Sequence, residues 1–289
     1  MADPTSFTNT YRPPTPPPTV TPTSLEPAYG PSPYDINFCY PLDTHTHTSI
    51  LESSRVRLTP FIPRLHASTY ISQVLAHPEL TQHFPSEHRS LAEFLTYLEY
   101  GVRRNSMWCL FAVLDKGGLA IDTEGASESP DGRGEGGSEE KEKEEEKMAG
   151  VIGLIRSDPT NLSTEIGYLM TFPSFQRTHI TTHAVCLLLQ FTLELPTRRA
   201  GALGLRRVEW RAYAGNDASV RAAERMGFRE EGTRRWYVAI AEGKEGYGEP
   251  REGDPMQGRK RIDSRVLAMC CDDWESGGRE HVESLMARL

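Results

Sequence analysis

A charged residue inside an apolar strand is the first position in this sequence with evident chemical potential. Residues 164–172 alternate in the manner of a β-strand and place Glu165, Gly167 and Leu169 on one face. A carboxylate on a central strand needs either a pocket in which it exchanges protons or a cationic partner. The sequence therefore offers Glu165 as a general base, with a structural ion pair as the alternative.

Polar residues with helix-capping properties form a second group. Asn216 precedes a short amphipathic segment, and its side-chain oxygen can accept hydrogen bonds from the amides of a first helical turn. Gly227 follows the segment, where helices often end in a left-handed residue. Residues 205–213, upstream, alternate apolar and charged side chains. The pattern predicts a strand followed by a helix over 216–226, with Ser219 in its first turn.

This unit resembles the C-terminal half of the GNAT N-acyltransferases. In their RimJ/RimL-type branch, Asn-x-x-Ser is followed by Ala/Val-x-x-x-Gly-Phe, and this chain has Asn216-Asp217-Ala218-Ser219 and then Ala223 before Gly227-Phe228. The resemblance implies transfer of an acyl group, with acetyl-CoA as co-substrate, to an amine. The acceptor would be a small molecule or a protein amine.

The resemblance assigns coenzyme A to the end of strand 164–172 and the start of the following helix. Unpaired amides and the positive end of a helix dipole attract its pyrophosphate. The family signature there is Gln/Arg-x-x-Gly-x-Gly/Ala, often seen as Arg-Gly-x-Gly-x-Ala. When Arg177 is matched to the arginine of the second form, Thr178 and Ile180 stand at the glycine positions. The predicted cofactor contacts are Leu169, Met170, Thr171, Gln176, Arg177, Thr178, His179, Ile180, Thr181, Thr182, Asn216 and Ser219.

The resemblance also implies roles in the reaction. Many family members have a tyrosine acid four residues before the glycine, but this chain has Ala223. In the RimJ/RimL-type branch the serine contacts or protonates the thiol, a role that falls to Ser219 unless that residue only caps the helix. Glu165 would deprotonate the amine, directly or through water. A backbone N–H near 169–171 would stabilise the oxyanion.

Two pairs of histidines are candidates for metal binding. His179 and His183 are spaced i, i+4, but Ile-Thr-Thr stands between them, so the glutamate of His-Glu-x-x-His is absent. A pair on the helix surface without a third ligand is the favoured interpretation. His45 and His47 fall in a segment expected to be a solvated linker. No metal is expected.

The composition sets two segments apart from a folded domain. Ten of the 21 prolines fall in residues 1–40, and residues 1–50 are expected to be a disordered tail. Residues 117–147 hold eleven acids and four bases, a charge of −7 against −8 for the whole chain. This acidic low-complexity insertion is expected to be a solvated loop. No nucleic-acid partner is expected.

The cysteine spacing and the lengths of the apolar runs indicate the cellular compartment in which the protein is expected. The five cysteines are odd in number and form no Cys-x-x-Cys pair. The N-terminus has no signal-peptide pattern, and no apolar run approaches the ~20 residues of a membrane helix. We expect a cytoplasmic, or nucleocytoplasmic, protein that does not bind membranes and is a monomer or homodimer.

The remaining periodicity predicts one α/β domain over residues 53–275, with a tail or short helix over 276–289. The resemblance implies that this domain has the GNAT fold, a mixed central sheet with helices on both faces. The alternative function is a catalytically weak or inactive coenzyme A-binding protein with interaction tails. The predicted strands are 55–61, 107–114, 148–155, 164–172, 205–213, 228–240 and 265–271, and the predicted helices are 64–75, 86–104, 180–195 and 216–226.

Overall fold

The computed structural model describes residues 36–42, 50–85, 87–117, 146–240 and 246–288. Its strands are β1 (Val56–Pro60), β2 (Cys109–Asp115), β3 (Lys147–Asp158), β4 (Ser163–Thr171), β5 (Arg207–Tyr213), β6 (Arg229–Ala239) and β7 (Arg261–Cys270). The helices are α2 (Pro63–Ala76), α3 (Leu91–Tyr97), α4 (Ile180–Leu193), α5 (Asp217–Arg225), α6 (Cys271–Asp273) and α7 (Arg279–Ala287). Short 3₁₀ or π segments are η1 (Pro78–Thr81), η2 (Leu98–Arg103), η3 (Pro173–Phe175) and η4 (Trp274–Gly278). The order of strands and helices is the expected one.

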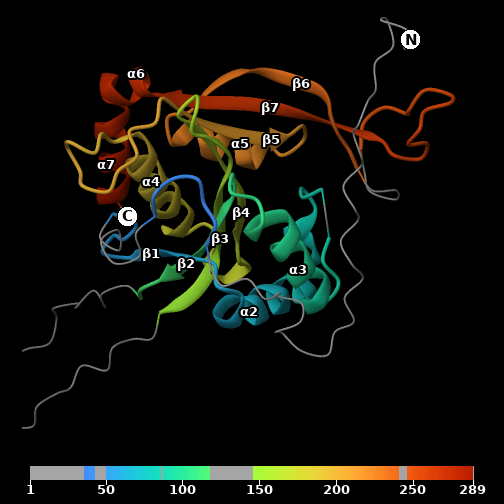
Figure 1. Ribbon diagram of the computed structural model, residues 1–289, viewed down its shortest axis with the longest axis horizontal. Helices are drawn as coiled ribbons and strands as arrows, with labels where there is room; N and C mark the ends of the chain where they lie inside the picture. The colour runs from blue at the N-terminus through green and yellow to red at the C-terminus, as the bar shows by residue number, and fades with distance from the viewer. Residues whose placement is uncertain (1–35, 43–49, 86, 118–145, 241–245, 289) are drawn as a thin grey trace, which may run out of the picture.

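The strands form one mixed sheet of seven, in the order β1-β2-β3-β4-β5-β7-β6, with helices on both faces (Figure 1). Only β4 and β5 are parallel neighbours; every other pair is antiparallel. The apolar run in β2 follows from this arrangement because both of its faces are covered. Leu110, Ala112 and Leu114 pack with α2 and α3, whereas the alternate residues pack with α4.

Segments at both ends of the chain pack against this domain. Trp274 and Val282 are fully buried in the same apolar cluster as α4, so the fold extends past residue 275. Residues 36–42 lie within the predicted tail, yet Tyr40 is buried. Its hydroxyl lies 2.9 Å from the carbonyl oxygens of Asp158 and Ser163, at the turn between β3 and β4.

One helix begins later than expected. The sequence predicts a helix from residue 86, but α3 starts at Leu91. The reason is local, because the Ser90 side chain accepts a hydrogen bond from the amide of Glu93, and the Glu93 carboxylate accepts one from the amide of Arg89. This reciprocal arrangement is close to a capping box, and it sets the helix start.

The two parallel strands separate part of the way along the sheet. β4 pairs with β5 only from Ser163 to Ile166, after which β4 stays with β3 and β5 stays with β7. Bulges accompany the separation, and Arg156 in β3 and Tyr168 in β4 both have left-handed backbone, with φ of 50° and 51°. A cleft therefore opens between the second half of β4 and the end of β5.

The structure also bears on membrane association and the acidic insertion. No helix among the described ranges is both long and apolar enough to cross a bilayer. His45 and His47 lie outside the described residues, as do residues 118–145 of the predicted insertion. Its two ends are adjacent, because Asp115 of β2 pairs with Lys147 of β3.

We predict that an Asn-Gly turn can replace residues 118–145 without loss of fold or activity. The free energy of unfolding should rise by roughly 1–2 kcal/mol, because each halving of loop length lowers the closure cost by about 0.6 kcal/mol. Denaturant titration and turnover with acetyl-CoA measure the two quantities against the full chain. Unfolding or loss of turnover in the shortened chain would show that the insertion belongs to the site.

Candidate active site

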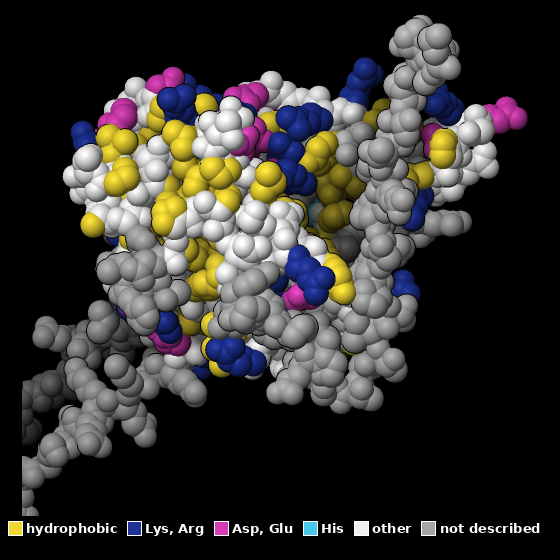
Figure 2. All heavy atoms as spheres, in the orientation of Figure 1, with side chains coloured by type: hydrophobic (Ala, Val, Ile, Leu, Met, Phe, Trp, Pro, Cys, Tyr) yellow, Lys and Arg dark blue, Asp and Glu magenta, His cyan; other side chains and the backbone are white. Residues whose placement is uncertain are grey.

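The cleft between β4 and β5 contains an aromatic pocket. On the face shown in Figure 2, a recess with apolar side chains in its depth is flanked by Lys and Arg side chains. The pocket brings Glu165 together with Asn216 and Ser219, which lie 51 and 54 residues later in the sequence. Its aromatic lining consists of Phe84, Tyr97, Trp108, Tyr168, Trp210, Tyr213 and Tyr237.

Glu165 lies in this pocket and is also ion-paired. Nη1 of Arg156 lies 2.8 Å from both of its carboxylate oxygens, and Nε of Arg211 lies 3.2 Å from one of them. Burial raises the pKa of the Glu165 carboxyl above its ordinary value, although Arg156 and Arg211 act in the opposite direction. The two alternatives for Glu165, a pocket and a cationic partner, are therefore both present.

Gly167 leaves room for that carboxylate. A Cβ atom at position 167 would lie 2.6 Å from Cδ1 of Ile155 and 3.3 Å from Oε1 of Glu165. A larger residue would force one of these two side chains to move. Because Gly167 has no Cβ atom, the Glu165 side chain can occupy its observed position on this face of β4.

Ser219 is oriented by a neighbouring tryptophan. Nε1 of Trp210 donates a hydrogen bond of 3.0 Å to the Ser219 hydroxyl oxygen. An indole N–H only donates, so the hydroxyl hydrogen of Ser219 is left to donate into the cleft. Asn216 caps α5 as expected, because its side-chain oxygen accepts a hydrogen bond from the Ser219 amide at 3.2 Å.

A narrow groove continues from the aromatic pocket along β4. It is lined by Leu169, Met170, Thr171 and Gln176 on one side and by α5 on the other, and Ser219 lines both hollows. This part of β4 pairs with β3 along one edge but not with β5 along the other. Backbone groups on the open edge are available to a ligand.

A basic pocket lies at the start of α4. Arg177 has left-handed backbone with φ of 61°, so the conformation that glycine favours falls there, and not at Thr178 or Ile180 as the sequence comparison suggested. The side chain of Ile180 is buried, so only its backbone borders the loop. The polar lining of the basic pocket consists of Arg55, Asp115, Ser174, Arg177, Thr178, His179, Thr181, Thr182, Arg221 and Arg225.

The two helical histidines do not form the expected surface pair. His183 is 1% exposed, and its Nδ1 lies 2.9 Å from the Ser53 hydroxyl. Burial lowers the pKa of His183 to about 4. His179 lies at the mouth of the basic pocket, with Nε2 at 3.3 Å from a carboxylate oxygen of Asp115. The interpretation as a surface pair is wrong because β1 and the segment before it cover this side of α4.

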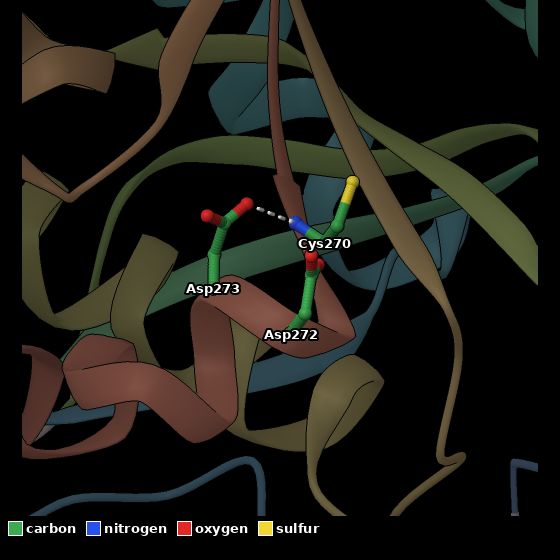
Figure 3. Close-up of side chains that lie close together, drawn as sticks. All are labelled: Cys270, Asp272 and Asp273. Atoms are coloured by element: carbon green, nitrogen blue, oxygen red, sulfur yellow. Dashed lines mark hydrogen bonds between the residues drawn. The ribbon is translucent and has the colours of Figure 1, made fainter.

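Cys270, Asp272 and Asp273 have side-chain atoms within 4.8 Å of one another, the only group of three possible ligands found in the described ranges (Figure 3). Asp273 is already engaged. Its carboxylate accepts a hydrogen bond from the Cys270 amide at 3.1 Å and pairs with Arg229 at 2.7 Å. The cluster is thus explained as the cap that begins α6.

Several pocket residues were missed by the sequence analysis. Arg156, Arg211 and Tyr237 come from β3, β5 and β6, and they meet around Glu165 and its neighbour Glu209. The alternation of β5 was visible in the sequence, but the partner of each charge was not. Sheet register brings them together, and the register is not encoded in local spacing.

Comparisons with known proteins agree with this geometry. Residues 55–229 match the family model described as an acetyltransferase (GNAT) domain. Solved structures with this fold include a GCN5-related N-acetyltransferase from Brucella melitensis, at 24% identity and TM-score 0.57, with 81% of this chain and 84% of that chain covered. No match was found among curated proteins.

Two further structures have the same fold and carry coenzyme A or a derivative. Spermidine N-acetyltransferase from Vibrio cholerae, in complex with CoA and spermine, is 15% identical, with TM-score 0.50 and coverage of 77% of this chain and 99% of that chain. RimJ from Mycobacterium smegmatis, in complex with CoA-disulfide, is 16% identical, with TM-score 0.52 and coverage of 79% and 88%. The expected GNAT fold is confirmed.

We predict that buried His183 makes the protein less stable in acid. Because its pKa is about 4 in the folded state and ordinarily about 6.5, the unfolded chain binds the proton more tightly. Stability should therefore be full above about pH 6.5 and should fall as the pH drops toward 4. His66, whose pKa burial also lowers to about 4, contributes in the same direction.

The measurement is the free energy of unfolding between pH 4 and pH 7.5. His183→Gln should remove part of the pH dependence, and the exposed control His77→Gln should leave it unchanged. If the free energy of unfolding changes equally steeply with pH in His183→Gln and in the parent protein, His183 is not the source of the pH dependence.

Proposed function

The chain belongs to the GNAT acetyltransferase family, and we propose that it transfers the acetyl group of acetyl-CoA to a primary amine by direct attack in a ternary complex. The observation that carries the proposal is the common pocket of Glu165 and Ser219 at the opening between β4 and β5. We place the chain in the RimJ/RimL-type branch on the Asn-x-x-Ser sequence at 216–219. A cytoplasmic location and a monomeric or homodimeric state remain predictions from the sequence.

The residues of the basic pocket and groove fit coenzyme A. Four arginines against one aspartate give the basic pocket a positive charge that suits phosphates. Thr181 and Thr182 are in the first turn of α4, where amides lack partners within the helix. In the proposal, Arg177 and these amides hold the pyrophosphate. The pantetheine arm follows the open edge of β4, beside Asn216.

The harder step is to form a neutral amine. At pH 7 roughly 0.04% of a lysine-like amine is neutral, and roughly 15% of an α-amine, from ordinary pKa values of about 10.4 and 7.7. In the proposal Glu165 takes this proton, directly or through water. Its raised pKa makes it a stronger base than an ordinary glutamate. The amine nitrogen then attacks the thioester carbonyl carbon.

The tetrahedral intermediate carries an oxyanion and then loses the thiolate. In the proposal, a backbone N–H near residues 169–171, where β4 is not paired with β5, stabilises the oxyanion. As the C–S bond breaks, Ser219 passes its hydroxyl hydrogen to sulfur and receives, directly or through water, the second proton that the attacking nitrogen loses. Protonation of the leaving sulfur by Ser219 lowers the barrier only slightly, because a thiol of pKa ~8.5 leaves as thiolate at pH 7 at a cost of only ~2 kcal/mol. The absence of the tyrosine acid is therefore tolerable.

A second candidate function is coenzyme A binding without turnover. The doubly paired carboxylate of Glu165 favours it, because Arg156 and Arg211 occupy its oxygens and oppose the rise of its pKa that burial causes. Protein that binds acetyl-CoA but acetylates no amine in a broad screen would support this alternative.

For the proposed base, Glu165→Gln should lower kcat/KM by about 10²–10⁴-fold, the usual effect of removing a positioned base. The loss should shrink as the pH rises, because the free amine then forms without help. The affinity for acetyl-CoA should stay nearly constant. Ser219→Ala should lower kcat/KM by a smaller factor than Glu165→Gln does. Steady-state kinetics over a pH range and calorimetry provide these values.

Glu209→Gln is the matched control. Glu209 pairs with Arg207 and Arg211 in the same ionic network but does not line the pocket. Its effect on kcat/KM should be small and independent of pH. Equal activity of Glu165→Gln and the parent protein at every pH would remove Glu165 from the mechanism.

For the phosphate site, Arg177→Ala should weaken coenzyme A binding by ~1.5–3 kcal/mol, the scale of a hydrogen bond to a charged group. Calorimetry with coenzyme A gives the affinity. Arg198→Ala is the control, since Arg198 is exposed and lies outside the three hollows. Unchanged affinity in Arg177→Ala would place the phosphates elsewhere.

A further inference from the structure

In the described lining of the aromatic pocket, the polar groups without a hydrogen-bond partner are largely donors. Arg156 directs Nη1 at Glu165, whereas its Nε and Nη2 have no acceptor among the described residues. These two nitrogens form the edge of a guanidinium that binds a carboxylate through two parallel hydrogen bonds. The Arg156 side chain is 41% exposed and lies over the ring of Tyr237, 5.7 Å from its centroid.

Tyr237 adds a second donor beside Arg156. Its hydroxyl oxygen accepts a hydrogen bond of 2.6 Å from Nη1 of Arg211. A guanidinium cannot accept a hydrogen bond in return, so the hydroxyl hydrogen of Tyr237 must point elsewhere. Both residues line the aromatic pocket, so its lining includes a guanidinium with an unpaired edge and a hydroxyl whose hydrogen is not bonded to Arg211.

The charge of the lining favours the same kind of ligand. Arg156 and Arg211 oppose one carboxylate, Glu165, whose two oxygens are already paired. An acceptor with several ammonium groups would therefore meet two arginines and no unpaired carboxylate in the described lining. A negatively charged group is better matched. The rest of the pocket lining is predominantly aromatic, so it suits a ligand whose remaining part is apolar.

We propose that the acceptor is an amine that also carries a carboxylate, with an apolar or aromatic body, as in an α-amino acid. The carboxylate is bound by the free edge of Arg156 and by the hydroxyl of Tyr237, and the amine is turned toward Glu165. The inference rests on the proposed function, since it names the substrate class of the same site. Arg156 and Tyr237 act as specificity residues.

The test compares phenylalanine with phenylalaninamide, and both with spermidine. Rates are expressed per concentration of neutral amine, because the amide has the more acidic ammonium group. The value of kcat/KM should be at least about tenfold higher for phenylalanine, the factor that one charged hydrogen bond supplies. Arg156→Gln should abolish this preference, measured as the ratio of the two kcat/KM values within the variant, and Arg156→Lys should restore part of the ratio. The control Arg198→Gln should keep it.

Binding without turnover gives a second readout. Calorimetry with coenzyme A-saturated protein should find N-acetylphenylalanine bound at least about tenfold more tightly than N-acetylphenylalaninamide, and Tyr237→Phe should reduce the ratio. Amine acetylation with no preference for the carboxylate, or with spermidine as the best substrate, would overturn the inference and leave the proposed function standing. Selective binding of the acid without any acetylation would support the pocket's specificity and contradict the proposed function. A protein that neither binds the acid selectively nor acetylates any amine would contradict both the inference and the proposed function.

Discussion

The site depends on one constraint, the loss of pairing between two parallel strands after Ile166 and Trp210. Each strand keeps its antiparallel neighbour, so the separation does not unravel the sheet. The bulges at Arg156 and Tyr168 turn the backbone at this level. The result is an open strand edge in the middle of a sheet, where backbone groups can bind a ligand as they would bind another strand.

Ion pairs cross the sheet at the level of the last paired residues of β4 and β5, where Glu165 is the register partner of Glu209. Arg156 of β3, Glu165 of β4 and Arg211 of β5 are in contact, and Glu209 extends the contact to Arg207 and, through it, to Glu231 of β6. Breaking one partner of a buried pair costs about 3–5 kcal/mol, because the other charge remains buried. The same network that holds the diverging strands therefore sets which charges the pocket presents. Stability and specificity are coupled through Arg211.

Features set by local interactions were predictable from the sequence. Asn216 caps α5, and Gly227 ends it with φ of 96°, because each depends only on residues within one turn. The partners of Glu165 and the burial of His183 were not predictable. Arg211 lies 46 residues from Glu165 in sequence, and Ser53 lies 130 residues from His183. These contacts follow from sheet register and helix placement, which no local pattern specifies.

Two departures from the family pattern have physical explanations in the fold. Arg177 adopts the left-handed conformation without being glycine, which costs on the order of 1 kcal/mol or more but places a cation at the basic pocket. Ala223, where many family members have tyrosine, is fully buried in the core. Ser219 lies one helical turn earlier on the same face of α5 and reaches the cleft. A small residue therefore fits the core at position 223, and the hydroxyl that this helix presents to the cleft is that of Ser219.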